Sequence, residues 1–188
     1  MITKNSIEND SYHWEGIDVS PEPLVEVIKY LKSLGYSAGE EQCTYLYESL
    51  LEGMLNIKQH AYSAEEDCKW TIDVSSQNNS FIVILRDFGL TIPTTFIKKI
   101  SPLNDVEYID DSVLIHEAVN SNFHLERRGL GLKSIISQVS KGTFEKVEIS
   151  SGKGILVYGI EGSIQKRPLN ATKGTSIAFY LTSGAELK

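Results

Sequence analysis

The chain has 188 residues and a formal net charge of -7, from 18 lysines and arginines against 25 aspartates and glutamates. This acidic balance argues against a general nucleic-acid-binding protein, whose affinity would depend on basic side chains that neutralise phosphates. The composition, 41% hydrophobic and 23% charged, is typical of a globular protein and not of a disordered chain. We therefore expect one folded domain that binds no nucleic acid.

The sequence shows no pattern of a metal cluster, a leader or a membrane span. Its two cysteines, Cys43 and Cys68, form no CxxC pair, so two reduced thiols are the simplest interpretation. Residues 1–10 are polar, and the longest apolar run, 81–85, is far shorter than the roughly 20 residues of a transmembrane helix. We expect a cytoplasmic protein with no membrane contact.

Residues 1–20 mix polar residues with isolated aromatic side chains, which fits either an arm or an edge strand. Apolar residues then recur at helical spacing over residues 24–34, after two prolines and before Gly35. A glycine directly after such a run is a common helix end. The sequence therefore predicts an arm followed by a first helix.

A second and longer helix is predicted over residues 37–61. Ser37 and Glu40, three residues apart, match the capping-box pattern at its start. Apolar residues recur along one side of the helix, which indicates that this side packs on a core. We expect residues 1–36, the arm and the first helix, to pack on a domain formed by residues 37–188.

The middle of the chain predicts a hairpin and then a long connection. Two runs with strand composition, 69–75 and 81–85, are joined by a short polar turn. Residues 93–128 are irregular, with short helices predicted near 96–100 and 112–119. A connection of this length is usually a functional lid or a disordered segment.

The last third of the chain predicts one helix and three strands. The helix covers residues 133–139, and the strands cover 146–150, 154–160 and 175–181, with glycines between them. Their β-branched and aromatic content predicts an antiparallel meander. Runs of helices and runs of strands without strict alternation predict an α+β two-layer sandwich, with helices on one face of a mixed, mostly antiparallel sheet.

Glu52, Asn56 and His60 form a polar stripe on the second helix. Positions four residues apart advance only about 40° around a 3.6-residue helix, so the three side chains share one face. Two interpretations are open: the stripe could contact a ligand, or it could be the solvent-exposed face of an amphipathic helix. Taken alone, the helix favours the second interpretation.

Asp87 and Gly89 directly follow the apolar run 81–85 and precede Pro93. A carboxylate at the end of a buried strand can accept a hydrogen bond from an amino group of a ligand, and a glycine two residues later permits close approach of the backbone. Asp-x-Gly is also a common turn sequence. Both interpretations stay open from this motif alone.

Two glycine motifs follow later in the chain. The first leads into the helix at 133–139 and reads Arg127, Arg128, Gly129, Leu130, Gly131, Leu132. Free N–H groups of such a turn, together with the helix dipole, can hold phosphate oxygens, although glycines also form plain hinges. The second motif, Gly174 and Thr175, opens the last strand and by itself indicates little.

The order of these motifs carries more information than any one of them. ExxxNxxxH on a helix, DxG after a strand, a long connection, GLGL before a helix and GT on a late strand resemble the gyrase, heat-shock chaperone, histidine kinase and MutL (GHKL) ATPase superfamily. The resemblance covers roughly residues 40–182. It implies the α/β sandwich known as the Bergerat ATP-binding fold, with ATP and Mg²⁺ as ligands.

Within the superfamily, residues 52–62 resemble the anti-sigma factor and serine kinase branch of the histidine kinase-like ATPases, which often shows Asn followed four residues later by His-Ala-Tyr. Sensor histidine kinases usually have a basic residue where this chain has Gln59. They also need a phosphoacceptor histidine on a dimerisation helix, and His13 lies outside any helical heptad. A sensor kinase is therefore disfavoured.

The resemblance implies roles for three motif residues around the adenine ring of the nucleotide. Asp87 would bind the adenine amino group, and Gly89 would give the base room. Thr175 would support the same pocket through a hydroxyl contact. One residue departs from the family pattern DxGxGxP, because Thr91 replaces the second glycine. The hinge of the lid is then expected to be stiffer or to close differently.

The resemblance also implies roles at the phosphates. Asn56 would coordinate Mg²⁺ through its amide oxygen, and Glu52 would orient or deprotonate the attacking hydroxyl. The phosphates would lie against Gly129, Leu130, Gly131 and Leu132, with Arg128 or its neighbour Arg127 as a source of positive charge. The connection over residues 94–128 would act as a lid, although it is longer than in a minimal anti-sigma kinase.

Two functions remain open at this point. One is a regulatory enzyme that hydrolyses ATP or transfers its γ-phosphate to a serine or threonine of a partner protein. The other is an ATP-gated binding module in which nucleotide closes the lid and creates a partner surface, without phosphate transfer. The family resemblance implies a protein partner encoded separately and allows a homodimer.

Overall fold

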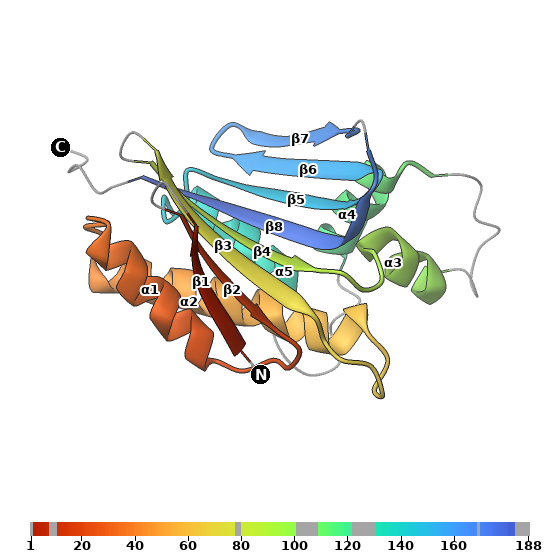
Figure 1. The fold of residues 1–188 in the computed structure, drawn as a ribbon. Helices are drawn as coiled ribbons and strands as arrows, with labels where there is room; N and C mark the ends of the chain where they lie inside the picture. The colour runs from red at the N-terminus through yellow and green to blue at the C-terminus, as the bar shows by residue number, and fades with distance from the viewer. Residues whose placement is uncertain are drawn as a thin grey trace.

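A computed structural model describes the fold of residues 2–7, 11–77, 80–100, 109–121, 131–168 and 170–182 (Figure 1). Within these ranges the chain is α+β, with five α-helices, one short π-helix and one antiparallel sheet. None of the described helices is long and apolar enough to cross a bilayer.

The helices are α1 (Glu22–Ser33), α2 (Glu40–Asn56), the π-helix η1 (Ile57–Ala61), α3 (Ile92–Ile100), α4 (Asp111–Asn120) and α5 (Gly131–Ser140). The strands are β1 (Ile2–Ile7), β2 (Ser11–Gly16), β3 (Trp70–Gln77), β4 (Ser80–Asp87), β5 (Lys146–Gly152), β6 (Gly154–Gly159), β7 (Gly162–Lys166) and β8 (Thr172–Thr182).

The sheet has eight strands in the order β1-β2-β3-β4-β8-β5-β6-β7. Each neighbouring pair is antiparallel, so the expectation of a mixed sheet is wrong for the described residues. The predicted meander of the last three strands is also wrong. β8 does not follow β6 in the sheet but lies between β4 and β5. Its inward side chains Ile177, Phe179 and Leu181 are buried there.

The N-terminal residues take the second of the two forms considered for them, an edge strand. β1 and β2 form a hairpin, and β2 pairs with β3. Trp14 on β2 is 1% exposed and packs into the same core as α1 and α2. β1 and β2 are therefore part of the sheet, not an appendage to it.

The starts of three helices show how local sequence sets their bounds. α2 begins later than Ser37, because the Gly39 N–H donates to the side-chain oxygen of Gln42 at 2.8 Å. α3 begins with Pro93 in its first turn, where the missing N–H costs nothing. α4 begins after Asp110, whose carboxylate accepts the backbone N–H of Ser112 at 2.9 Å. The two short helices expected in the connection are thus both present.

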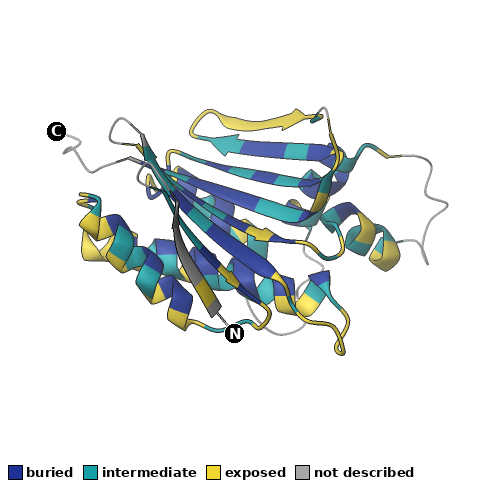
Figure 2. Cartoon of the chain, in the orientation of Figure 1, coloured by how far each residue is buried: buried dark blue, intermediate teal, exposed yellow. Residues whose placement is uncertain are grey.

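One face of the sheet carries the core. Along β4 buried and less buried residues alternate, and Phe81, Val83 and Leu85 belong to the core cluster together with residues of α1, α2 and α5. These helices lie along that face of the sheet (Figure 1), and the buried positions gather between the two (Figure 2). α3 and α4 lie toward the end of the sheet at which β4 and β5 terminate.

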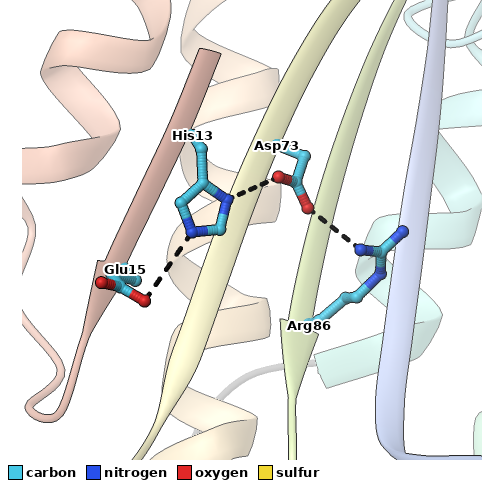
Figure 3. Close-up of polar contacts among 4 residues, drawn as sticks. All are labelled: His13, Glu15, Asp73 and Arg86. Carbon is cyan, nitrogen blue, oxygen red and sulfur yellow. Dashed lines mark hydrogen bonds and ion pairs between the residues drawn. The ribbon is translucent and has the colours of Figure 1, made fainter. Parts of the chain in front are cut away.

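The other face of the sheet bears polar side chains from β2, β3 and β4 (Figure 3). His13 Nδ1 lies 2.7 Å from Asp73 Oδ1, and Arg86 donates to Asp73 Oδ2 at 3.1 Å. Glu15 lies 3.8 Å from His13 Nε2. Because alternate residues of a strand point to opposite faces, this network is separated by the sheet from every core residue of β4.

Candidate functional site

The three central strands end in one inward-facing row of polar side chains. The row consists of Asp87 on β4, Thr175 on β8 and Ser151 on β5. Each lies two residues along its strand from a buried core residue: Asp87 from Leu85, Thr175 from Ile177, and Ser151 from Ile149. Because side chains two positions apart on a strand point to the same face of the sheet, the three polar side chains lie on the face that carries the core. The apolar face of the sheet therefore becomes polar at one end of these central strands.

Asp87 is the only carboxylate among the described residues that is buried, at 5% exposure. Its Oδ1 accepts the backbone N–H of Gly89 at 2.9 Å. Burial raises the pKa of the Asp87 carboxyl to about 6, and hydrogen bonds from the backbone N–H groups of Gly89 and Thr175 act in the opposite direction. The carboxylate is therefore ionised above about pH 6, while facing a largely apolar space.

Two glycines allow the backbone to close around this carboxylate. Gly174 has a φ of +68°, and a Cβ there would lie 2.3 Å from the Asp87 carbonyl oxygen. A Cβ on Gly89 would lie 2.2 Å from the carbonyl oxygen of Ala61. Only glycine fits either position. The close approach at Gly89 joins the Asp87 loop to the end of η1, where the Leu90 N–H donates to Ala61 O at 2.7 Å.

The helix that carries the polar stripe changes its winding at the site. α2 ends at Asn56, and η1 continues as a π-turn, a feature that is rare and often found at functional sites. Tyr62 follows η1, donates to Lys69 O at 2.8 Å and accepts the Phe88 N–H at 3.0 Å. Tyr62 thereby ties the end of the helix to the loop after Asp87.

Asn56 holds an unsatisfied polar group. Its Nδ2 is buried and has no hydrogen-bond partner among the described residues. Its Oδ1 lies 3.9 Å from where a Cβ of Gly131, the first residue of α5, would stand. A buried amide that lacks a partner costs about 1–3 kcal/mol, which is a reason to expect a ligand beside it.

A pocket opens between the polar row, α2, η1, α3, α4 and α5. Its empty space, open mouth included, is about 790 Å³. Its walls are mostly apolar. The polar and charged residues that line it are Asn56, His60, Asp87, Thr95, Lys99, Ser121 and Thr175.

Several residues predicted from the motifs meet in this pocket. Asn56, Asp87, Leu132 and Thr175 line it, although they come from four elements that are far apart in the sequence. Gly89 shapes the loop beside it, and Gly131 begins α5 with a φ of +46°.

Glu52 stands apart from the other predicted residues. It is half-buried on α2, one turn before Asn56, and is not among the residues that line the pocket. Arg127, Arg128, Gly129 and Leu130 lie outside the described residues, as do residues 101–108 and 122–126 of the expected lid.

Sequence reasoning missed several residues of this site, among them Ser151, Phe96 and Lys99, and it gave Tyr62 no role there. Ser151 and Tyr62 make hydrogen bonds that hold its backbone. Tyr62 belongs to the His-Ala-Tyr motif, whereas the sequence around Ser151 carries no signal of this. Phe96 and Lys99 line the pocket from α3. Their spacing of three places them on one face of the helix, and this spacing is the one signal that was available.

Comparison of the sequence with models of known protein families and with curated proteins gives no match.

Gly174→Ala should weaken the fold more than Gly142→Ala. Both glycines have positive φ, +68° and +74°, but only Gly174 would meet another group within 4 Å. Gly142→Ala reports the backbone strain alone, about 1 kcal/mol, and Gly174→Ala adds the clash with Asp87. Urea unfolding measures both. Equal losses of stability would show that the backbone does not close tightly on Asp87.

Asp87→Asn should change how stability depends on pH. The folded-state pKa of about 6 lies above the ordinary 3.8, so the folded protein binds this proton more tightly than the unfolded chain does. The stabilisation is complete below about pH 4 and is lost as pH rises through 6. Asn keeps an acceptor for the Gly89 N–H and does not titrate.

The free energy of unfolding of Asp87→Asn relative to wild type should therefore rise by about 2 kcal/mol between pH 4 and pH 7.5. Urea titrations at several pH values measure it. The exposed Asp67, changed to Asn, is the control and should give a profile parallel to wild type. A parallel profile for Asp87→Asn as well would contradict the burial of this carboxyl.

Proposed function

We propose that the chain is a Mg-ATP-binding regulatory protein of the histidine kinase-like ATPase type, built as a two-layer Bergerat sandwich. The observation that carries the proposal is the convergence of Asp87, Thr175, Asn56 and the start of α5 on one pocket. Four motifs with no sequence proximity would meet by chance in few folds. The resemblance to the GHKL superfamily assigns each of them to one ligand, a purine nucleotide with its metal.

The base would bind at the polar row. The Asp87 carboxylate accepts hydrogen bonds and cannot donate above about pH 6, which suits the amino group of adenine. Around it the pocket walls are apolar and include Ile57, Leu85, Ile92 and Ile177. Apolar walls with a single fixed acceptor are a common way to bind and orient a flat heterocycle.

The metal and phosphates would lie toward Asn56 and the start of α5. The Asn56 side chain offers a carbonyl oxygen, a ligand type that Mg²⁺ accepts together with phosphate oxygens and water. Bound Mg²⁺ would neutralise charge on the phosphates. The first turn of α5 offers backbone N–H groups that no helical carbonyl satisfies. The donor set present therefore fits a Mg-nucleotide.

Lys99 would supply positive charge from α3. It lines the pocket from α3, seven residues after Ile92, which is about 10 Å along a helix. Ile92 lies beside the polar row, because its N–H donates to Ser151. A cation at this distance from the base would stand near the phosphates of a bound nucleotide.

We propose hydrolysis of ATP, or transfer of its γ-phosphate to a serine or threonine of a separately encoded protein partner, as the reaction, with Glu52 as the base. A second candidate is an ATP-gated binding module without phosphate transfer. It is favoured by the position of Glu52 outside the pocket lining and by the two helices α3 and α4, which flank the pocket and lie between the nucleotide motifs. A cytoplasmic location is part of the proposal, and the family resemblance allows a homodimer.

The protein should bind ATP and ADP with Mg²⁺ and reject GTP, which has an oxygen where adenine has its amino group. Asp87→Asn removes a charge-assisted hydrogen bond, so the affinity for ATP should fall about 10-fold or more. Calorimetric titration at pH 7.5 measures it, with Asp67→Asn as the control. An unchanged affinity in Asp87→Asn would show that the adenine assignment is wrong.

Lys99→Ala should weaken binding of ATP and ADP roughly 10-fold and leave adenosine binding unchanged, because only the phosphates would contact the ammonium group. Lys98→Ala is the matched control, since Lys98 is an exposed neighbour on the same helix that does not line the pocket. The same titrations compare the two variants. Equal effects of both would indicate general electrostatic attraction in place of a phosphate contact.

Glu52→Ala should abolish turnover and leave ATP binding nearly intact, because the carboxylate would act on the nucleophile. Loss of a general base costs on the order of 10²-fold to 10⁴-fold in rate. Asn56→Ala should weaken Mg²⁺-dependent binding as well, because it removes a metal ligand. Phosphate release and transfer of labelled γ-phosphate are the assays, run with and without a candidate partner.

Label on a partner serine or threonine would select the kinase, and phosphate released only to water would select hydrolysis. Nucleotide binding with no turnover in the wild type would favour the ATP-gated module. Wild-type turnover in Glu52→Ala would remove Glu52 from the mechanism.

A further inference from the structure

Ser151 is the fully buried member of the polar row, at 0% exposure. Its hydroxyl oxygen makes three polar contacts. It lies 2.9 Å from the carbonyl oxygen of Gly174, 3.0 Å from the hydroxyl oxygen of Thr175, and 2.9 Å from the backbone nitrogen of Ile92. These contacts occupy the one proton and the two lone pairs that a serine hydroxyl possesses.

The three contacts determine which group donates in each. A carbonyl oxygen can only accept, so the Ser151 proton points to Gly174. The Ile92 N–H can only donate, so it takes one lone pair of Ser151. The remaining lone pair faces Thr175, and the Thr175 hydroxyl must therefore donate its proton to Ser151.

This arrangement leaves the Thr175 oxygen with lone pairs alone to offer to the pocket that it lines. The neighbouring Asp87 carboxylate is also an acceptor once ionised. Two adjacent strands thus present acceptors side by side at the polar row. A ligand amino group would satisfy them, and a ligand oxygen at the same place would be repelled by both.

We propose that Ser151 sets the specificity of the pocket for a 6-amino purine over a 6-oxo purine, by holding the Thr175 hydroxyl as an acceptor. Ser151 is a positioning residue, because it acts through Thr175 and does not line the pocket itself. The inference rests on the proposed function, since it takes the ligand to be a purine nucleotide.

The test compares ATP with inosine triphosphate, which carries an oxygen in place of the 6-amino group and a proton on N1. Ser151→Ala frees the Thr175 proton to point into the pocket. Binding of inosine triphosphate should then strengthen roughly 3-fold to 10-fold, and the preference for ATP should fall by about the same factor. Calorimetric titration of both nucleotides with Mg²⁺ measures the ratio.

Two further variants separate this effect from a loss of stability. Ser49→Ala also removes a buried serine hydroxyl, from α2, and should leave the nucleotide preference unchanged. The double variant Ser151→Ala with Thr175→Val should bind inosine triphosphate less tightly than Ser151→Ala does, because no hydroxyl remains to donate. A merely structural role of Ser151 would predict neither result.

The outcomes are distinguishable. Wild-type protein that binds neither nucleotide would refute the proposed function. Wild-type protein that prefers ATP, with the same preference in Ser151→Ala, would refute this inference alone. If Ser151→Ala does not fold, the same two titrations on Thr175→Val test the inference. It should weaken ATP roughly 3-fold or more and should not weaken inosine triphosphate, so the preference for ATP should fall, and an unaltered ratio in that variant would overturn the inference.

Discussion

A buried carboxylate at the end of a central strand is the constraint around which the site is arranged. An ionised group in apolar surroundings is costly unless hydrogen bonds compensate for the lost water. Two backbone N–H groups, those of Gly89 and Thr175, supply part of this compensation to Asp87. They can do so because Gly174 and Gly89 let the chain approach closely. The remaining cost appears as the raised pKa, and it leaves the carboxylate able to gain from a donor that a ligand brings.

The position of β8 in the sheet makes this arrangement available. As the last strand, it inserts between β4 and β5, so Thr175 stands beside Asp87 on one side and Ser151 on the other. The Ser151 hydroxyl also holds the first turn of α3 through Ile92. The residues that would read the base are therefore connected directly to a helix that lines the pocket. A ligand that moves Thr175 would therefore shift the first turn of α3 through the Ser151 hydroxyl, which contacts both.

Sequence patterns predicted the helices well, because each buries one apolar face with a period of 3.6 residues. The expected helix at 24–34 is α1, and the one at 133–139 is α5. The strands were predicted by composition, but the pairing of β8 was not, because pairing depends on contacts between distant residues that no local pattern records. β7 was missed since all its residues are exposed and no alternation marks it.

The candidate site was predicted in part, and for a definite reason. Asp87, Gly89, Asn56 and Thr175 were found through the order of short motifs. Ser151 and the π-turn η1 escaped, because hydrogen bonds between β5, β8 and α3 and a change of helical winding leave no sequence pattern. Lys99 lies in a helix that was predicted only as a short apolar segment. Such positioning residues become visible only when the backbone is in place.

In the proposed complex, this pocket holds a Mg-nucleotide by the amino group of its base and by its phosphates. A crystal structure with Mg²⁺ and a non-hydrolysable ATP analogue tests it most directly. We expect the adenine amino nitrogen at about 2.7–3.2 Å from the Asp87 carboxylate and the Mg²⁺ bound by the Asn56 side-chain oxygen. A nucleotide bound elsewhere on the chain, or a base in this pocket whose amino group faces away from Asp87, would contradict it.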